Sequence, residues 1–200
     1  MVYSPQLFIG VQHTPDQLAP VFQLLEERLH PGIVIGTEAC QSPITEGHKP
    51  AFTIFYNALM AYISNKGGRA VCLGRHEDCL YLDRREARTK DIVRRAMNVQ
   101  EEVIKKSGVP VKGDLAEDFY KRSLKMLYDE EGFTQKDFLR DRTAIQLARE
   151  HEPEIIIYGV GHLGALYSPF STADVKIIIP EGRTVPKEYW PQAPWLRDLK

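Results

Sequence analysis

The sequence contains little cysteine and no long apolar run. Its three cysteines, Cys40, Cys72 and Cys79, are odd in number and form no paired C-x-x-C motif, so we expect neither a disulfide framework nor a structural zinc site. Free thiols are typical of a reducing compartment, which predicts a cytoplasmic protein. No segment approaches the roughly 20 apolar residues that a membrane span needs, and the start shows no signal-peptide pattern.

An excess of charge of either sign is also missing. The chain has 26 basic and 27 acidic residues, a formal net charge of -1. Such a balance provides no general attraction to nucleic acid or to an anionic membrane. The basic residues between Arg84 and Lys106 alternate with acidic ones, as on a solvated helix face. We therefore expect neither nucleic acid nor a membrane as the partner.

Apolar runs alternate with amphipathic segments along most of the 200 residues. Thr14 and Gln17 form a capping box that predicts the start of the first helix. The predicted strands are residues 6–12, 33–37, 71–73, 154–160 and 175–179, with a further extended piece at 80–82, and the predicted helices are 14–30, 50–65, 84–106, 115–128 and 134–151. This order predicts a single α/β domain over residues 1–180, with a mostly parallel sheet flanked by helices.

Residues 181–200 differ from the rest of the chain. Prolines recur here, and both tryptophans, Trp190 and Trp195, lie in this segment. Because two indoles are costly to leave in water, we expect a C-terminal arm that packs on this subunit or on a neighbour.

Two predicted strands end in the same signature, Gly-x-x-His. The first runs from Gly10 to His13 and the second from Gly159 to His162, while a third strand ends in Glu38. Open α/β sheets bind ligands at the carboxyl ends of their strands, and glycine lets the backbone approach a ligand closely. Two imidazoles and a carboxylate there suit metal ligation or acid–base chemistry.

Two other hypotheses fit the same residues. Gly159, Gly161 and Gly164 also satisfy G-x-G-x-x-G after a strand, which predicts a nucleotide- or dinucleotide-binding module. Pro169 argues against it, because it shortens the helix on which a pyrophosphate would rest. Alternatively, the histidines hold a metal or another ligand without catalysis. Bound NAD would favour the first hypothesis, and metal without turnover the second.

Taken together, these motifs resemble the TraB/PrgY–Tiki superfamily, which includes the erythromycin esterases and the ChaN-like haem-binding lipoproteins. The similar segments are Ile9–His13, Val34–Glu38, Leu139–Asp141 and Tyr158–Gly164. Members carry two Gly-x-x-His motifs, a strand-end Glu and a helix Arg around one cleft. The resemblance therefore implies a site of His13, Glu38, Arg140 and His162.

The resemblance also implies an activity. We expect a small cytosolic hydrolase that cleaves a peptide or ester bond of a small-molecule or peptide substrate. In it, either His13 and His162 hold a divalent metal or one of the two acts directly as the base. Glu38 would orient or deprotonate water, and Arg140 would stabilise the developing oxyanion. The chain lacks the long insertions of larger members, so we expect a cleft that is either open or completed by another subunit of a homo-oligomer.

Overall fold

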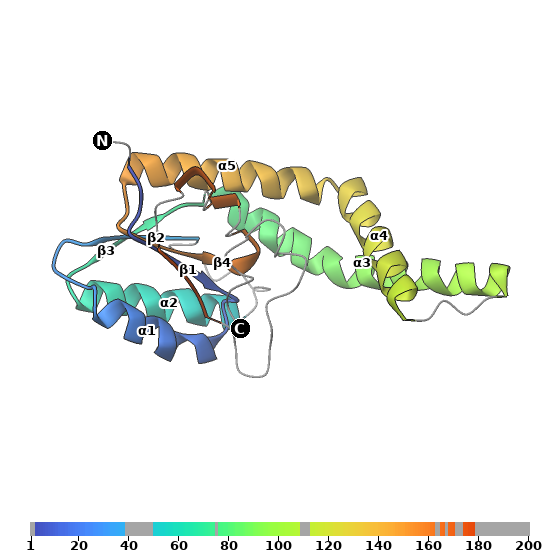
Figure 1. Cartoon of the computed structure of the whole chain (residues 1–200), viewed down its shortest axis with the longest axis horizontal. Coiled ribbons are helices and arrows are strands. Elements are labelled where there is room, and N and C mark those ends of the chain that lie inside the picture. Colours follow the sequence, from blue (N-terminus) through green and yellow to red (C-terminus); the bar gives the residue numbers. More distant parts are fainter. Residues whose placement is uncertain are drawn as a thin grey trace. The chain divides into compact units, whose positions relative to one another are not determined.

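A computed structural model describes residues 3–38, 50–74, 76–108, 113–162, 165–166, 168–170 and 174–178 (Figure 1). The strands are β1 (Leu7–Val11), β2 (Val34–Thr37), β3 (Arg69–Cys72), β4 (Ile155–Gly159) and β5 (Asp174–Ile177). The α-helices are α1 (Leu18–Glu26), α2 (Pro50–Asn65), α3 (His76–Ser107), α4 (Asp114–Glu130) and α5 (Phe133–His151). Three short 3-10 helices are η1 (Pro15–Gln17), η2 (Val160–His162) and η3 (Ser168–Phe170). No helix in these ranges has the length and apolar character that crossing a membrane requires.

The sheet has five strands in the order β3-β2-β4-β1-β5, and every neighbouring pair is parallel. This confirms the predicted α/β fold with a parallel sheet. The central strand β4 is fully buried, as expected of a strand that reads Ile-Ile-Ile-Tyr-Gly. Its two neighbours, β1 and β2, are the other strands that end in a predicted site residue. The predicted site therefore falls at the middle of the sheet.

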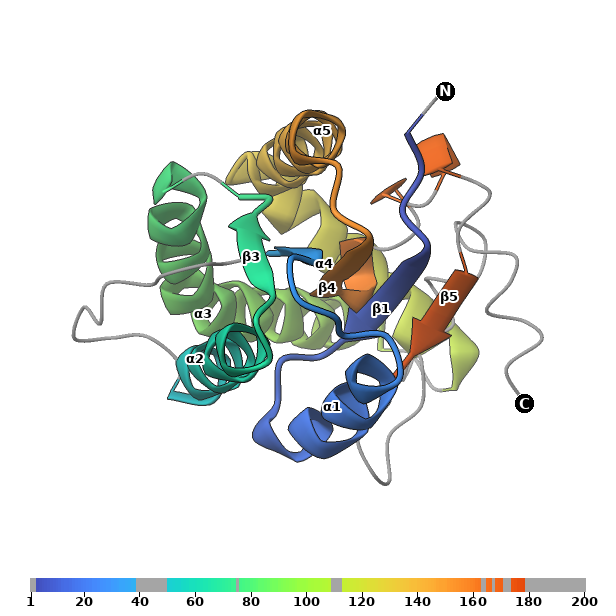
Figure 2. The same cartoon turned by 90° about the vertical axis from the view of Figure 1, so that its left-hand side faces the viewer.

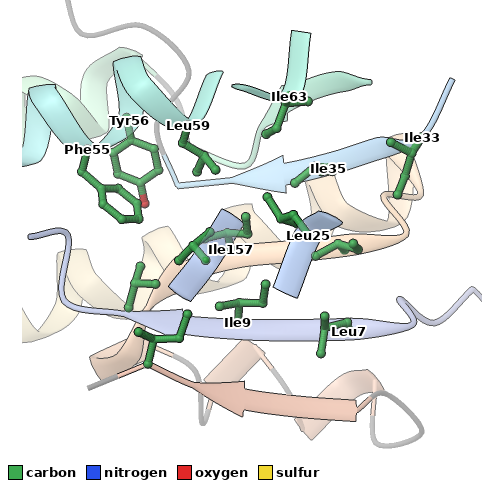
Figure 3. Close-up of a cluster of buried hydrophobic side chains, with 14 residues drawn as sticks. Leu7, Ile9, Leu25, Ile33, Ile35, Phe55, Tyr56, Leu59, Ile63 and Ile157 are labelled. Atoms are coloured by element: carbon green, nitrogen blue, oxygen red, sulfur yellow. The ribbon is translucent and has the colours of Figure 1, made fainter. Parts of the chain in front are cut away.

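Helices cover both faces of the sheet (Figure 2). On one face, Leu7 and Ile9 of β1 and Ile157 of β4 pack against α1 and α2, as Figure 3 shows. On the other face, Phe8 and Ile156 pack with Ala144 and Ala148 of α5 and with Phe170 of η3. Successive strand residues point to opposite faces, so one apolar run contributes to both layers.

The chain divides into two compact units. One comprises residues 1–76 and 141–200 and contains the sheet, α1, α2 and the second half of α5. The other comprises residues 77–140, and its small core consists of Ile92, Ala96, Leu127 and Phe133. Ion pairs across this second unit join α3 to the turn after α4, among them Arg88–Glu131 at 2.7 Å.

Two expected elements differ from the structure. Residues 80–82 were expected to be extended but lie inside α3, which begins at His76; three residues of alternating pattern do not separate a strand from a helix. The first helix was expected to reach His30, yet α1 ends at Glu26 and the chain then turns back toward β2. Gly32, at φ +88°, donates its N–H to the Gly67 carbonyl in this return. The proposed arm over 181–200 lies outside the described residues.

Tyr3 ties the start of the chain to the loop before β4. Its hydroxyl donates to the Pro153 carbonyl at 2.7 Å, and burial, with Glu152 nearby, raises the pKa of this phenol well above its ordinary value. Above about pH 10 the unfolded chain ionises this group while the folded chain does not, so the fold loses stability there.

We expect Tyr3→Phe to lower the free energy of unfolding by about 1 kcal/mol at neutral pH, where the hydrogen bond is lost. The difference from the native protein should shrink above about pH 10, because the variant lacks the ionising phenol. Urea unfolding at several pH values measures both effects. A constant difference across that range would contradict the interpretation.

Candidate functional site

At the carboxyl end of β4 the chain continues to the opposite face of the sheet from the one that it covers after β1 and β2. After β1 and β2 the chain continues into α1 and α2, which pack on one face, whereas after β4 it continues through η2 and η3 on the α5 side. Val11 at the end of β1 is level with Gly159, and Thr37 at the end of β2 is level with Ile157. Open α/β sheets bind their ligands at such a switch point.

His13 and Glu38 meet over the end of β4. His13 Nε2 lies 3.0 Å from Glu38 Oε2, and the same oxygen accepts the N–H of Gly159 at 2.9 Å. The Glu38 side chain is only 4% exposed. A buried carboxylate requires such partners, because an isolated buried charge is costly. We call this arrangement the His13–Glu38 pair.

Gly159 makes the close approach of these two side chains possible. A Cβ atom at this position would lie 2.9 Å from Glu38 Oε2 and 2.9 Å from His13 Cε1. Any other residue would therefore displace the pair. The glycine was expected to admit a cofactor, but in this structure the space beside it holds the pair itself.

The backbone of His13 adopts an unusual conformation. Its φ is +59°, in the left-handed region that residues other than glycine rarely occupy. The ring lies against Tyr56 of α2, with centroids 5.3 Å apart, and approaches Phe55 edge-on at 6.0 Å. Figure 3 shows both aromatic rings at one end of the layer between α2 and the sheet. Strain of this kind concentrates at functional sites, where the surroundings maintain it.

His162 has a carboxylate partner of its own. Its Nδ1 lies 2.8 Å from Asp141 Oδ1 on α5, and its ring meets Tyr158 edge-on at 5.8 Å. Both side chains are partly buried, at 18% and 15% exposure. We call this the His162–Asp141 pair. Because it contacts the α5 layer while His13 contacts the α2 layer, the two imidazoles approach the end of the sheet from opposite faces.

The other predicted site residues are placed as follows. Gly10 is buried within β1 and level with Tyr158, and its carbonyl accepts the Ile178 N–H. Gly161 lies exposed in η2, and Gly164 is outside the described residues. Arg140 belongs to the second unit, where it is buried and lies 3.5 Å from Asp137 on the same helix. Its role toward an oxyanion therefore stays a prediction.

Three residues that the structure brings to these pairs were not predicted from the sequence. Asp141 was noted only as the neighbour of Arg140, although a carboxylate on the helix that leads into a His-bearing strand was a usable signal. Tyr56 lies in the predicted helix over residues 50–65 and carries no signal of a site in the sequence. Gln17 was assigned to helix capping alone, and nothing in its local pattern indicates its contacts near His13.

Metal ligation by both histidines would need further ligand side chains close to them. Within the part of the chain that the structure describes, no three His, Cys, Asp or Glu side chains are grouped as ligands. The contacts present are instead two separate imidazole–carboxylate pairs. The divalent metal thus stays a prediction.

No protein-family model, curated protein or solved structure matches the chain. The resemblance to the TraB/PrgY–Tiki superfamily therefore rests on the motif residues themselves. Of those, His13, Glu38 and Gly159 are in mutual contact, and His162 follows Gly159 by one short turn.

Proposed function

We propose that this protein is a hydrolase in which His13 activates water at the carboxyl end of β4. The observation that supports this most is the buried Glu38 carboxylate against His13 Nε2, at 3.0 Å. A carboxylate oxygen at this distance favours a proton on Nε2, and in this proposal Nδ1 is then the nitrogen that takes part in proton transfer. Glu38 acts by orienting His13 and fixing its tautomer, and water is activated by the imidazole.

The His162–Asp141 pair supplies the second acid–base group. Asp141 engages Nδ1, so Nε2 of His162 is the nitrogen assigned to the substrate. Hydrolysis of an ester or peptide bond needs a base for the attacking water and an acid for the leaving group. Two oriented imidazoles beside one strand end fit those two roles. The substrate we propose is a small ester or a peptide.

The nucleotide-binding alternative is less well supported by the geometry. The N–H of Gly159 is directed to Glu38, and a carboxylate beside it would repel a pyrophosphate. Among the described residues after β4, the chain forms the 3-10 helices η2 and η3 and no long helix whose N-terminus would hold a phosphate.

The test is a hydrolysis panel of p-nitrophenyl esters, peptides and phosphate esters with the purified protein. We expect turnover of an ester or peptide, reduced by about a hundredfold or more in His13→Ala and in His162→Ala, since positioned acid–base groups contribute about that much. Thermal unfolding of both variants separates lost chemistry from lost folding.

Elemental analysis and a titration with NAD and ATP complete this test. One equivalent of divalent metal that both variants lose would support the predicted metal role. Saturable nucleotide binding without turnover would contradict the hydrolase and favour the binding module. Bound metal without turnover of any of the three bond classes would favour a carrier.

A further inference from the structure

Gln17 is a buried polar residue that the proposed chemistry does not use. It is the last residue of η1 and is only 1% exposed. A buried amide side chain needs partners for its oxygen and its nitrogen, because an unmade hydrogen bond in the interior is expensive. Both of these atoms have partners in the structure.

Its amide oxygen accepts hydrogen bonds from the two residues that flank His13. Oε1 lies 2.8 Å from the backbone nitrogen of Gln12 and 3.3 Å from that of Thr14, and the Thr14 hydroxyl is also 3.3 Å away. A single acceptor thus gathers the N–H groups on both sides of His13. This closes the loop in which His13 has its left-handed φ.

The amide nitrogen connects the same loop to the far edge of the sheet. Nε2 donates to the carbonyl of Ile178, just after β5, and the Ile178 N–H donates to the carbonyl of Gly10 in β1. The loop that carries His13 is therefore connected through Gln17 to a second strand end. Both ends of the Gln17 amide are used.

We propose that Gln17 is a positioning residue that holds His13 in its left-handed conformation against Glu38. Only a side chain with an amide or carboxylate oxygen at this position can accept from both the Gln12 and the Thr14 N–H groups. A catalytic effect of Gln17 rests on the proposed function of His13, whereas the effect on the His13 geometry does not.

Two substitutions of similar length separate positioning from general stability. Gln17→Met removes the acceptor and the donor. Gln17→Glu keeps an oxygen for the Gln12 and Thr14 N–H groups, but as a carboxylate it sets its second oxygen against the Ile178 carbonyl in place of the lost donor. If Gln17 serves stability alone, a folded Gln17→Met variant should keep the His13 geometry. If it positions His13, Glu should rescue what Met loses.

The readout is the NMR cross-peak between the His13 Hε1 and Gly159 Hα protons, which the closeness of His13 Cε1 to Gly159 predicts. We expect it in the native protein and in Gln17→Glu, and its loss in folded Gln17→Met. Val21→Ala, a core change in α1, is the matched control and should retain the cross-peak. Should Gln17→Met not fold, Gln17→Ala replaces it in this comparison, because alanine also removes the acceptor.

Loss of the cross-peak in folded Gln17→Glu, or its retention in folded Gln17→Met, would overturn the proposal. Because this measurement needs no substrate, its outcome is independent of whether the chain is a hydrolase. With a substrate in hand, we expect Gln17→Met to lower kcat by about tenfold or more with little change in KM, as misplaced catalytic groups do, and Gln17→Glu to restore kcat.

Discussion

Glu38→Gln should reduce turnover by about a hundredfold or more while the protein stays folded, since it removes the group that orients His13. The amide keeps an oxygen for the Gly159 N–H, so we expect a stability loss of no more than about 1 kcal/mol. Because the same Oε2 position faces both the Gly159 N–H and His13 Nε2, the amide oxygen keeps both contacts and the negative charge is lost. The charge is thus removed with almost no change of shape.

Glu154→Gln is the matched control for this experiment. Glu154 lies just before β4, at its other end, and its carboxylate is 3.4 Å from His30 Nε2. The same substitution there alters a second His–Glu contact that faces solvent and is far along the strand from the site. Turnover by Glu154→Gln should equal that of the native protein. Equal turnover by Glu38→Gln and Glu154→Gln would show that the His13–Glu38 pair has no part in the chemistry.

The fold could be predicted from the sequence because its signals are local. The apolar runs at 6–12, 33–37 and 154–160 are typical of buried parallel strands, and each of them forms one. Neighbouring strands of a parallel sheet end at the same edge, so a residue after each strand was already placed at that edge. This is why His13 and Glu38 were assigned together without any knowledge of their contact.

What could not be predicted depends on strand order and on side-chain direction. The sequence does not show that β4 lies between β1 and β2, and this order is what brings Glu38 and His13 over Gly159. Nor does spacing show that His162 turns to Asp141 on the α5 side. The capping box of Thr14 and Gln17 was evident, but its extension to Gln12 and Ile178 depends on contacts distant in sequence.

The division into two units is a second feature without a local signal. Helices α3 and α4 show ordinary amphipathic patterns, which any helix that covers a sheet would also show. Their apolar residues instead pack on one another, with Ile92 and Ala96 of α3 against Leu127 of α4. Periodicity reports which face of a helix is buried but not what buries it.

Gly159→Ala should show whether this glycine is needed to leave room for the His13–Glu38 pair. The added Cβ would lie 2.9 Å from atoms of both His13 and Glu38, so the pair must move apart or away from β4. A shift of about 1 Å in a catalytic group costs on the order of a hundredfold in rate, and that is the loss in kcat we expect. Overpacking should also lower the free energy of unfolding by about 1–3 kcal/mol.

Gly36→Ala provides a control of matched stability for this change. Gly36 lies within β2, and an added Cβ there would lie 2.8 Å from Leu73 Cδ1 and 3.1 Å from Pro153 Cγ, away from the His13–Glu38 pair. It should therefore destabilise the fold to a similar extent, by about 1–3 kcal/mol, without loss of turnover per folded molecule. Urea unfolding and kcat, measured on the same preparations, compare the two variants.

Native turnover by the folded fraction of Gly159→Ala would mean that the chemistry does not depend on the His13–Glu38 pair. A hundredfold loss of kcat in Gly159→Ala, with native kcat in Gly36→Ala, would place the chemistry at the end of β4. Both substitutions add one methyl group to a strand, and they differ in which neighbours that group displaces.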